Sequence, residues 1–204
     1  MIIALGESIV ALGRGMSGFR LTAAVLGGAA AGLLLSAALW RLYFRQLGEA
    51  AEHRLAGLSG DARTRFARDV YTFLHLPLVA GVVLCALGMK TVVHQVADTG
   101  HYGLAEPLHG VVAWSLTGGV GVFLLGAAAI VLRSTGRRPT ALAVGGLCCL
   151  VAGPLVGLVP ALVALVLLAC TLSLLVALHA RRPSTAPAPA TAPGTPGAPG
   201  ASDV

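Results

Sequence analysis

The chain has 204 residues, of which 56% are hydrophobic and only 11% are charged, and its mean hydropathy is +0.86. A soluble domain carries about 25% charged residues, so this composition excludes most soluble enzymes and binding domains. The formal net charge is +6, but the 14 Lys and Arg residues are spread over several connecting loops and form no continuous basic stripe. We therefore expect a protein of the lipid bilayer that binds no nucleic acid.

Apolar stretches of membrane-spanning length recur along most of the chain. A transmembrane helix needs about 20 mainly apolar residues. The stretches predict an all-α bundle of six transmembrane helices over residues 1–13, 21–44, 70–89, 108–132, 140–158 and 160–180. The first of these covers only about 20 Å of a hydrocarbon core about 30 Å thick. Its shortness predicts that a segment is missing before Met1.

Two prolines lie inside the predicted helices, and a proline-rich segment follows the last one. Pro77 and Pro154 are expected to kink their helices, because proline has no N–H to donate to the preceding turn. Residues 181–204 are rich in Pro, Ala, Thr and Gly and have no apolar periodicity. This composition predicts a disordered tail without chemistry of its own, after a transmembrane domain over residues 1–180.

The loops on the two sides of the predicted membrane domain differ in their number of basic residues. Only Arg14, Arg20 and Lys90 fall on one side. The other side holds the remaining eleven: Arg41, Arg45, Arg54, Arg63, Arg65, Arg68, Arg133, Arg137, Arg138, Arg181 and Arg182. Cytoplasmic loops carry an excess of Lys and Arg. This difference predicts a multi-pass protein of the bacterial inner (cytoplasmic) membrane, with loops 45–69 and 133–140 and the C-terminus in the cytoplasm.

Aromatic residues gather at the ends of two predicted helices on the arginine-rich side. They are Trp40, Tyr43, Phe44, Tyr71 and Phe73. Such a belt is typical of the boundary between membrane and water. We therefore expect these side chains to lie at the cytoplasmic interface.

Two ionisable residues are predicted to lie at hydrocarbon depth, where charged groups are costly and mark functional sites by default. Glu7 is flanked by Ile and Val on both sides, and its alternative role is a structural hydrogen bond or a position near the cytoplasmic surface. His75 lies two residues before Pro77. Its imidazole lies close to a backbone ladder that the proline opens locally, and it either accepts a proton from Glu7 or simply bonds a backbone carbonyl. Glu7 and His75 are the candidate intramembrane functional residues.

No set of residues predicts a metal, a cofactor or a catalytic centre. Polar ligands gather on the side opposite the arginines, but their spacing matches no metal motif: His94, Asp98, His101, Glu106 and His109. The cysteines all lie in apolar stretches without CxxC spacing: Cys85, Cys148, Cys149 and Cys170. Motifs for nucleotide binding and for hydrolytic nucleophiles are also absent from the sequence. We expect no cofactor, no bound metal and no enzymatic activity.

Small residues recur at helical spacing in two predicted helices. Gly28, Gly32 and Ser36 follow one another every four residues, and so do Gly153 and Gly157. Small residues at this spacing let helix backbones approach closely in a membrane. We expect them to be helix-packing residues, and the spacing leaves open whether the partner helix belongs to the same chain or to another.

Three segments resemble the bacterial low temperature requirement A (LtrA) family. They are residues 5–11 (LGESIVA), 39–44 (LWRLYF) and 69–81 (DVYTFLHLPLVAG). Glu7 and His75 fall within this resemblance, which implies that they matter but assigns them no role. Later helices match only in general character. Members are longer polytopic inner-membrane proteins, so the resemblance also implies that this chain is the C-terminal half of one.

Two classes of function follow from these observations. In the first, an LtrA-type membrane protein supports growth or adaptation at low temperature, with transport of a small solute or a proton as its activity. Substitution of Glu7 or His75 would then abolish function. In the second, a structural or accessory protein assembles with itself, with the missing N-terminal half or with another membrane protein, without transport. Substitution of Gly28 or Gly32 would then disrupt the assembly.

Overall fold

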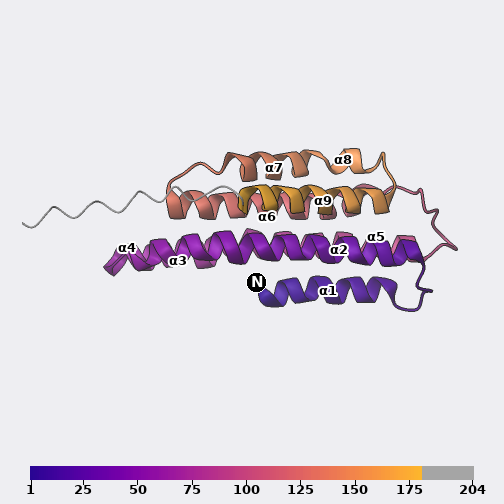
Figure 1. Cartoon of the computed structure of the whole chain (residues 1–204), viewed down its shortest axis with the longest axis horizontal. Helices are drawn as coiled ribbons and strands as arrows, with labels where there is room; N and C mark the ends of the chain where they lie inside the picture. The colour runs from indigo at the N-terminus through magenta and orange to yellow at the C-terminus, as the bar shows by residue number, and fades with distance from the viewer. Residues whose placement is uncertain (181–204) are drawn as a thin grey trace, which may run out of the picture.

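The computed structural model describes residues 1–180. Within this range the chain forms helices and no β-strand (Figure 1). The α-helices are α1 (Ile2–Met16), α2 (Ala23–Leu42), α3 (Glu49–Ala56), α4 (Gly60–Arg68), α5 (His75–Ala97), α6 (Gly110–Thr135), α7 (Thr140–Val151), α8 (Gly153–Val156) and α9 (Ala161–Ala180). Two π-helical segments complete the set, η1 (Tyr43–Gly48) and η2 (Asp69–Phe73). The predicted tail over 181–204 lies outside the described residues.

The helices run side by side along one axis and form a bundle (Figure 1). α1 lies at one edge and packs against α5 and α2, whereas α7 and α8 lie at the opposite edge against α6. Between these edges α5 packs on α6, and α2 packs on α9. The prediction of an all-α polytopic bundle is confirmed.

Four continuous helical segments are long and apolar enough to cross a membrane: Ala23–Ala56, Gly60–Ala97, Gly110–Thr135 and Ala161–Leu178. The other two predicted spans are shorter, since α1 has 15 residues and α7 has 12. The first two segments contain 34 and 38 residues. At 1.5 Å per residue each exceeds a hydrocarbon core about 30 Å thick by roughly 20 Å or more, so each extends beyond the bilayer at one end.

The helix predicted over residues 70–89 continues to Ala97 in the structure. Lys90 suggested a loop, but its side chain is exposed on one face of the helix while the residues on the opposite face are buried. Val92, Val93 and Val96 are buried in the core. One charged side chain on the outer face therefore does not end the helix, because the inner face remains apolar.

The helix predicted over residues 140–158 is interrupted near Pro154. α7 ends at Val151, and the four-residue α8 begins at Gly153. Proline has no N–H for the carbonyl one turn earlier, so the continuous helix with a kink that we predicted is a break in the structure.

α5 and α6 meet through glycines that allow close backbone contact. A Cβ on Gly81 would lie 2.6 Å from the carbonyl oxygen of Gly119, and a Cβ on Gly88 would lie 2.6 Å from the Cα of Leu116. Real Cβ atoms do not approach backbone atoms so closely. These glycines hold α5 and α6 together as small-residue contacts do in membranes.

The arginine-rich loops meet at one end of the bundle. Nη2 of Arg133, near the end of α6, donates to the Asp69 carboxylate at 3.3 Å, and its guanidinium lies 5.4 Å from the centre of the Phe66 ring. At the other end the Glu106 carbonyl accepts from Ala161 N at 3.1 Å and from Gln95 Nε2 at 3.1 Å. These contacts tie each set of loops to neighbouring helices.

Candidate functional site

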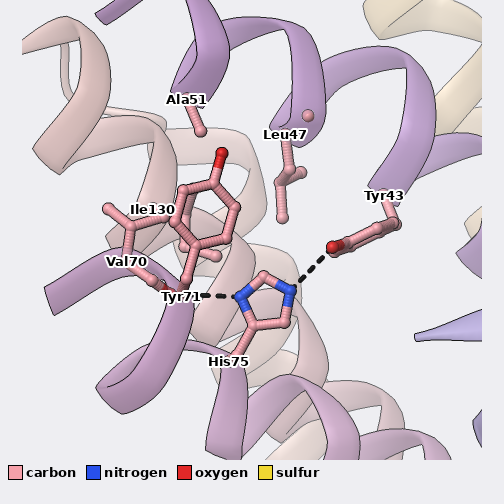
Figure 2. A pocket seen from close by; sticks show the side chains of 8 residues that line it. Tyr43, Leu47, Ala51, Val70, Tyr71, His75 and Ile130 are labelled. Atoms are coloured by element: carbon pink, nitrogen blue, oxygen red, sulfur yellow. Dashed lines mark hydrogen bonds between the residues drawn. The ribbon is translucent and has the colours of Figure 1, made fainter. Parts of the chain in front are cut away.

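The site with the most specific polar geometry lies where the two π-helical segments face each other, and His75 is at its centre (Figure 2). His75 is the first residue of α5 and directly follows η2 and Leu74. Pro77 lies two residues further on and has no N–H for the carbonyl of Phe73, at the end of η2. π-helical turns are rare and occur often at functional sites.

Both ring nitrogens of His75 have partners within residues 1–180. Nδ1 lies 3.1 Å from the Val70 carbonyl oxygen, and Nε2 lies 2.7 Å from the Tyr43 hydroxyl (Figure 2). A carbonyl only accepts hydrogen bonds, so Nδ1 carries a proton and donates it. In the neutral ring Nε2 is therefore unprotonated and accepts the hydrogen bond from Tyr43.

Aromatic rings enclose the imidazole on two sides. The Tyr71 ring stacks on it with an interplanar angle of 28° and a centroid distance of 5.8 Å, and the Tyr43 ring approaches edge-on at 5.5 Å. Aromatic rings attract one another in such stacked and edge-on arrangements, so the two tyrosines hold the imidazole in place.

A small cavity of about 10 Å³ lies beside the ring. Its apolar lining includes Leu47, Val70 and Ile130, which are fully buried. This volume is at the lower limit for a single water molecule, so the cavity is too small for an organic solute. The arrangement is suited to holding or passing a proton.

His75 lies near the end of the bundle and not at its midplane. Tyr43 follows the 20 residues of α2, which span about 30 Å, and Asp69, which binds Arg133, is one and a half turns before His75. We predicted His75 at hydrocarbon depth. The structure places it at the arginine-rich boundary of the apolar helices.

Glu7 lies elsewhere and faces outward. Its Oε1 accepts from Nη1 of Arg14 at 3.3 Å, and the two side chains are 53% and 65% exposed. Gly15 of α1 lies against Lys90 and Val93 of α5. Counting back along these parallel helices places Glu7 about 10 Å further along the bundle axis than His75.

The two candidate residues therefore do not form a joint site. The partners of His75 are the Val70 carbonyl, one of the alternatives we considered, and the Tyr43 hydroxyl, which sequence reasoning assigned to the interfacial belt. The sequence held one signal for this contact: Tyr43 and His75 lie in two of the three segments that resemble the same family. Contact between them depends on how α2 packs near α5.

The predicted helix-packing residues lie inside this chain's own bundle. A Cβ on Gly32 would lie 2.7 Å from the Leu12 side chain, and one on Gly28 would lie 3.4 Å from Val93. Gly153 faces the Trp114 ring, where a Cβ would come within 2.7 Å. A Cβ on Gly157 would lie 3.3 Å from the Pro154 carbonyl and 3.5 Å from that of Leu108. Ser36 is buried beside a groove between α1 and α2.

The polar residues at the opposite end include one close pair. His101 Nδ1 lies 2.9 Å from the Asp98 carboxylate in an exposed loop. This hydrogen bond lowers the pKa of Asp98 and raises the pKa of His101. Within residues 1–180 no cluster of three or more His, Cys, Asp or Glu side chains is arranged to hold a metal ion.

Four long apolar helices, close glycine contacts and a histidine held between π-helical turns define a polytopic α-helical membrane protein. A protein-family model described as "Bacterial low temperature requirement A protein (LtrA)" matches residues 1–177. The chain belongs to the LtrA family. The match covers the later helices as well as the three segments that first suggested the resemblance. No curated protein and no solved structure gives a significant match.

Proposed function

We propose that this LtrA-family membrane protein supports growth at low temperature through proton transfer at the His75–Tyr43 pair, without enzymatic turnover of a substrate. The observation that carries the proposal is the 2.7 Å hydrogen bond between Tyr43 Oη and His75 Nε2. Protonation of Nε2 reverses the direction of this bond, so that Nε2 donates to the Tyr43 hydroxyl and the hydroxyl proton turns into the adjoining cavity, which Tyr43 lines and which has room for one water molecule as acceptor. The heavy atoms do not need to move.

The space around the His75–Tyr43 pair is suited to the transfer of a proton and is too small for a larger transported species. The adjoining cavity of about 10 Å³ holds at most one water molecule. Buried Leu47, Val70 and Ile130 limit access of water from the interior of the bundle. Hydrogen bonds in such a low-dielectric environment are strengthened.

The proposed location is the cytoplasmic membrane, with the arginine-rich end of the bundle in the cytoplasm. The contact between Arg133 and Asp69 brings loops 45–69 and 133–140 to the same end, as that orientation requires. His75 would then lie near the cytoplasmic boundary. A pH difference across the membrane would act on it mainly through the cytoplasmic pH.

The test compares two small substitutions in a bacterial strain whose growth in the cold depends on this protein. Tyr43→Phe removes only the hydroxyl, and His75→Gln removes the titratable ring. Both are expected to abolish cold growth at normal membrane abundance, and to lower proton flux into liposomes that contain the purified protein and a pH-sensitive dye. Tyr71→Phe is the matched control, because it keeps the stacked ring. Normal cold growth of the Tyr43 and His75 variants would contradict the proposal.

The second candidate is an accessory protein without transport that assembles with another membrane protein. Gly28 and Gly32 do not provide the surface for it, because residues of this chain already fill the space before them. The observation that favours this role is the exposed ion pair between Glu7 and Arg14. Under it, the Tyr43 and His75 substitutions would be mild, and changes on the exposed side of α1 would be severe.

A further inference from the structure

Positive charge is concentrated where α6 ends and the chain turns towards α7. Arg133 lies near the end of α6, and Arg137 and Arg138 follow in the loop, at the same end of the bundle as α3 and α4 (Figure 1). Asp69 is the one carboxylate within 4.0 Å of these arginines in the described part of the chain, and it is shared. It binds Arg133 at 3.3 Å and Arg68 at 3.5 Å. This region therefore carries an excess of positive charge.

Two grooves run beside α6 and reach these arginines. One, of about 510 Å³, lies between α6 and Leu74 at the start of α5, and Arg133 is part of its lining. The other, of about 410 Å³, lies between α6 and α7, and Arg138 is part of its lining. Ala129 and Leu132 line both grooves, so they form a ridge with a groove on each side. Each groove thus joins an apolar wall to one guanidinium group.

The lining of the grooves changes from apolar to basic in the direction in which a lipid molecule does. It begins at Leu125 and reaches Arg133 eight residues later, about 12 Å along the helix. The Leu132 side chain between them is 47% exposed. Phe73, next to Leu74, is 63% exposed, and exposed aromatic residues are typical of the boundary between membrane and water. The apolar part therefore lies at the depth of acyl chains and the arginines at the depth of headgroups.

We propose that these two grooves bind one anionic phospholipid, with an acyl chain on each side of the ridge and the phosphate group between Arg133 and Arg138. Basic pockets between transmembrane helices on the cytoplasmic side bind anionic headgroups. A guanidinium group suits this role because it donates two parallel hydrogen bonds to phosphate oxygens. The inference is independent of proton transfer at His75.

Other occupants lack the complementary charge. A second copy that used the same surface would bring the same arginines together, and these repel. Residues 181–204 begin with Arg181 and Arg182 and contain one acidic residue, Asp203, so this segment is itself basic. A transmembrane helix of another protein would fill the apolar grooves but would leave the arginines unpaired unless it placed a carboxylate at their depth. An anionic phospholipid supplies both parts in one molecule.

The test titrates the purified protein in mild detergent with phosphatidylglycerol and counts bound lipids by native mass spectrometry. Phosphatidylcholine with the same acyl chains is the matched lipid. We expect one phosphatidylglycerol per chain, bound about tenfold more tightly than phosphatidylcholine. Arg138→Gln should weaken this binding about fivefold, the factor that corresponds to about 1 kcal/mol per arginine near anionic lipid. Arg54→Gln removes the same charge from an exposed residue of α3 that lines neither groove, and should have no effect.

A second variant separates a seated lipid from general attraction to a basic surface. Ala129→Phe fills the space between the grooves without changing the charge, and should weaken binding about tenfold. Ala30→Phe, at an exposed position of α2, is its control. Arg138→Gln is expected to unfold at the parent's temperature in lipid-free detergent, because the Arg138 side chain forms no ion pair within residues 1–180. It therefore remains decisive if Ala129→Phe is destabilised.

Four results would overturn the proposal. They are equal affinity for the two lipids, an equal loss in Arg54→Gln, full binding by Ala129→Phe, and displacement of phosphatidylglycerol by inorganic phosphate, which would indicate a site for a free anion. Protein taken directly from the native membrane gives a further check. A dimer, or a complex with another membrane polypeptide, that excludes the lipid would assign the grooves to that partner and overturn the proposal as well.

Discussion

The carbonyl oxygen of Gly119 on α6 occupies the position that a side chain on Gly81 of α5 would need, 2.6 Å from the ideal Cβ site. The same Cβ would also lie 2.7 Å from the amide nitrogen of Phe123. Both obstacles are backbone atoms, which cannot rotate aside. The α5–α6 pair at the centre of the bundle thus depends on the absence of a single methyl group.

Gly81→Ala is therefore expected to destabilise the protein. Overpacking of a close contact costs about 1–3 kcal/mol, while Ala gains up to about 1 kcal/mol over Gly in helix propensity. We expect a net loss of about 1–2 kcal/mol in the free energy of unfolding, measured by unfolding in mild detergent. Gly27→Ala, where a Cβ meets nothing within 4 Å, is the control and should be neutral or slightly stabilising. Equal stability of both variants would contradict this account of the contact.

The hydrogen bonds of His75 predict which ring nitrogen carries the proton. Because Nδ1 donates to the Val70 carbonyl, the neutral ring is expected to be the Nδ1-protonated tautomer. Nitrogen-15 NMR of histidine-labelled protein distinguishes the two forms. In Tyr43→Phe the Nε2 resonance should shift while Nδ1 stays protonated. Finding the Nε2-protonated tautomer in the parent protein would rule out the proposed direction of both bonds.

Removal of the Asp98 carboxylate is expected to lower the pKa of His101. In the parent protein the hydrogen bond to Asp98 raises the pKa of His101 above its ordinary value of 6.5. A raised folded pKa gives stability that is present below pH 6.5 and is lost as the pH rises through the folded value. The lowered pKa of Asp98 gives stability that is present above its ordinary value of 3.8 and is lost as the pH falls.

The Asp98–His101 pair therefore stabilises the folded protein between the two ordinary pKa values, from pH 3.8 to pH 6.5. An NMR titration of His101 in Asp98→Asn checks the expected fall in its pKa. His94→Gln is a control, because His94 contributes only the smallest of the effects on Asp98. An unchanged His101 titration in Asp98→Asn would show that the hydrogen bond is not formed in solution.

Ser36→Ala is expected to stabilise the protein. The Ser36 hydroxyl is buried without a partner, so its removal saves a desolvation cost of about 1 kcal/mol. Ser8→Ala is the matched control and should not stabilise, since that hydroxyl bonds the Ala4 carbonyl. Unfolding of the purified proteins in mild detergent measures the effect. A Ser36→Ala variant that is less stable than the parent would show that the hydroxyl already has a partner within the chain.

The helical class and most of the helices were accessible from sequence because hydropathy is a local property. A run of apolar residues such as Gly110–Thr135 forms a helix in a bilayer whatever its neighbours are, since only internal hydrogen bonds satisfy its backbone there. Boundaries were less accessible. Lys90 suggested that its helix ends there, but the helix continues to Ala97 because the valines after Lys90 are buried in the core. Pro154 was expected to kink its helix, and the helix is broken there instead.

The candidate site was predictable only in part. His75 could be selected as an ionisable residue in an apolar stretch, but its partner could not, because Tyr43 is 32 positions away and meets it only through the packing of two helical segments. Glu7 was selected by the same rule, and packing placed it on the opposite side of α1 from the bundle core.

The small residues show the same division. Spacing alone identified Gly28 and Gly32 as close-contact positions and left their partner undecided, and the tertiary structure supplied Leu12 and Val93 from this chain. Hydropathy, charge asymmetry and small-residue spacing can be read from the order of residues, so the sequence by itself determined the helical class and the close-contact positions. Only the tertiary structure decided which helix faces are buried, which hydroxyl has no partner and that His75 contacts Tyr43. These features depend on distances between helices, which are set only when the whole bundle packs.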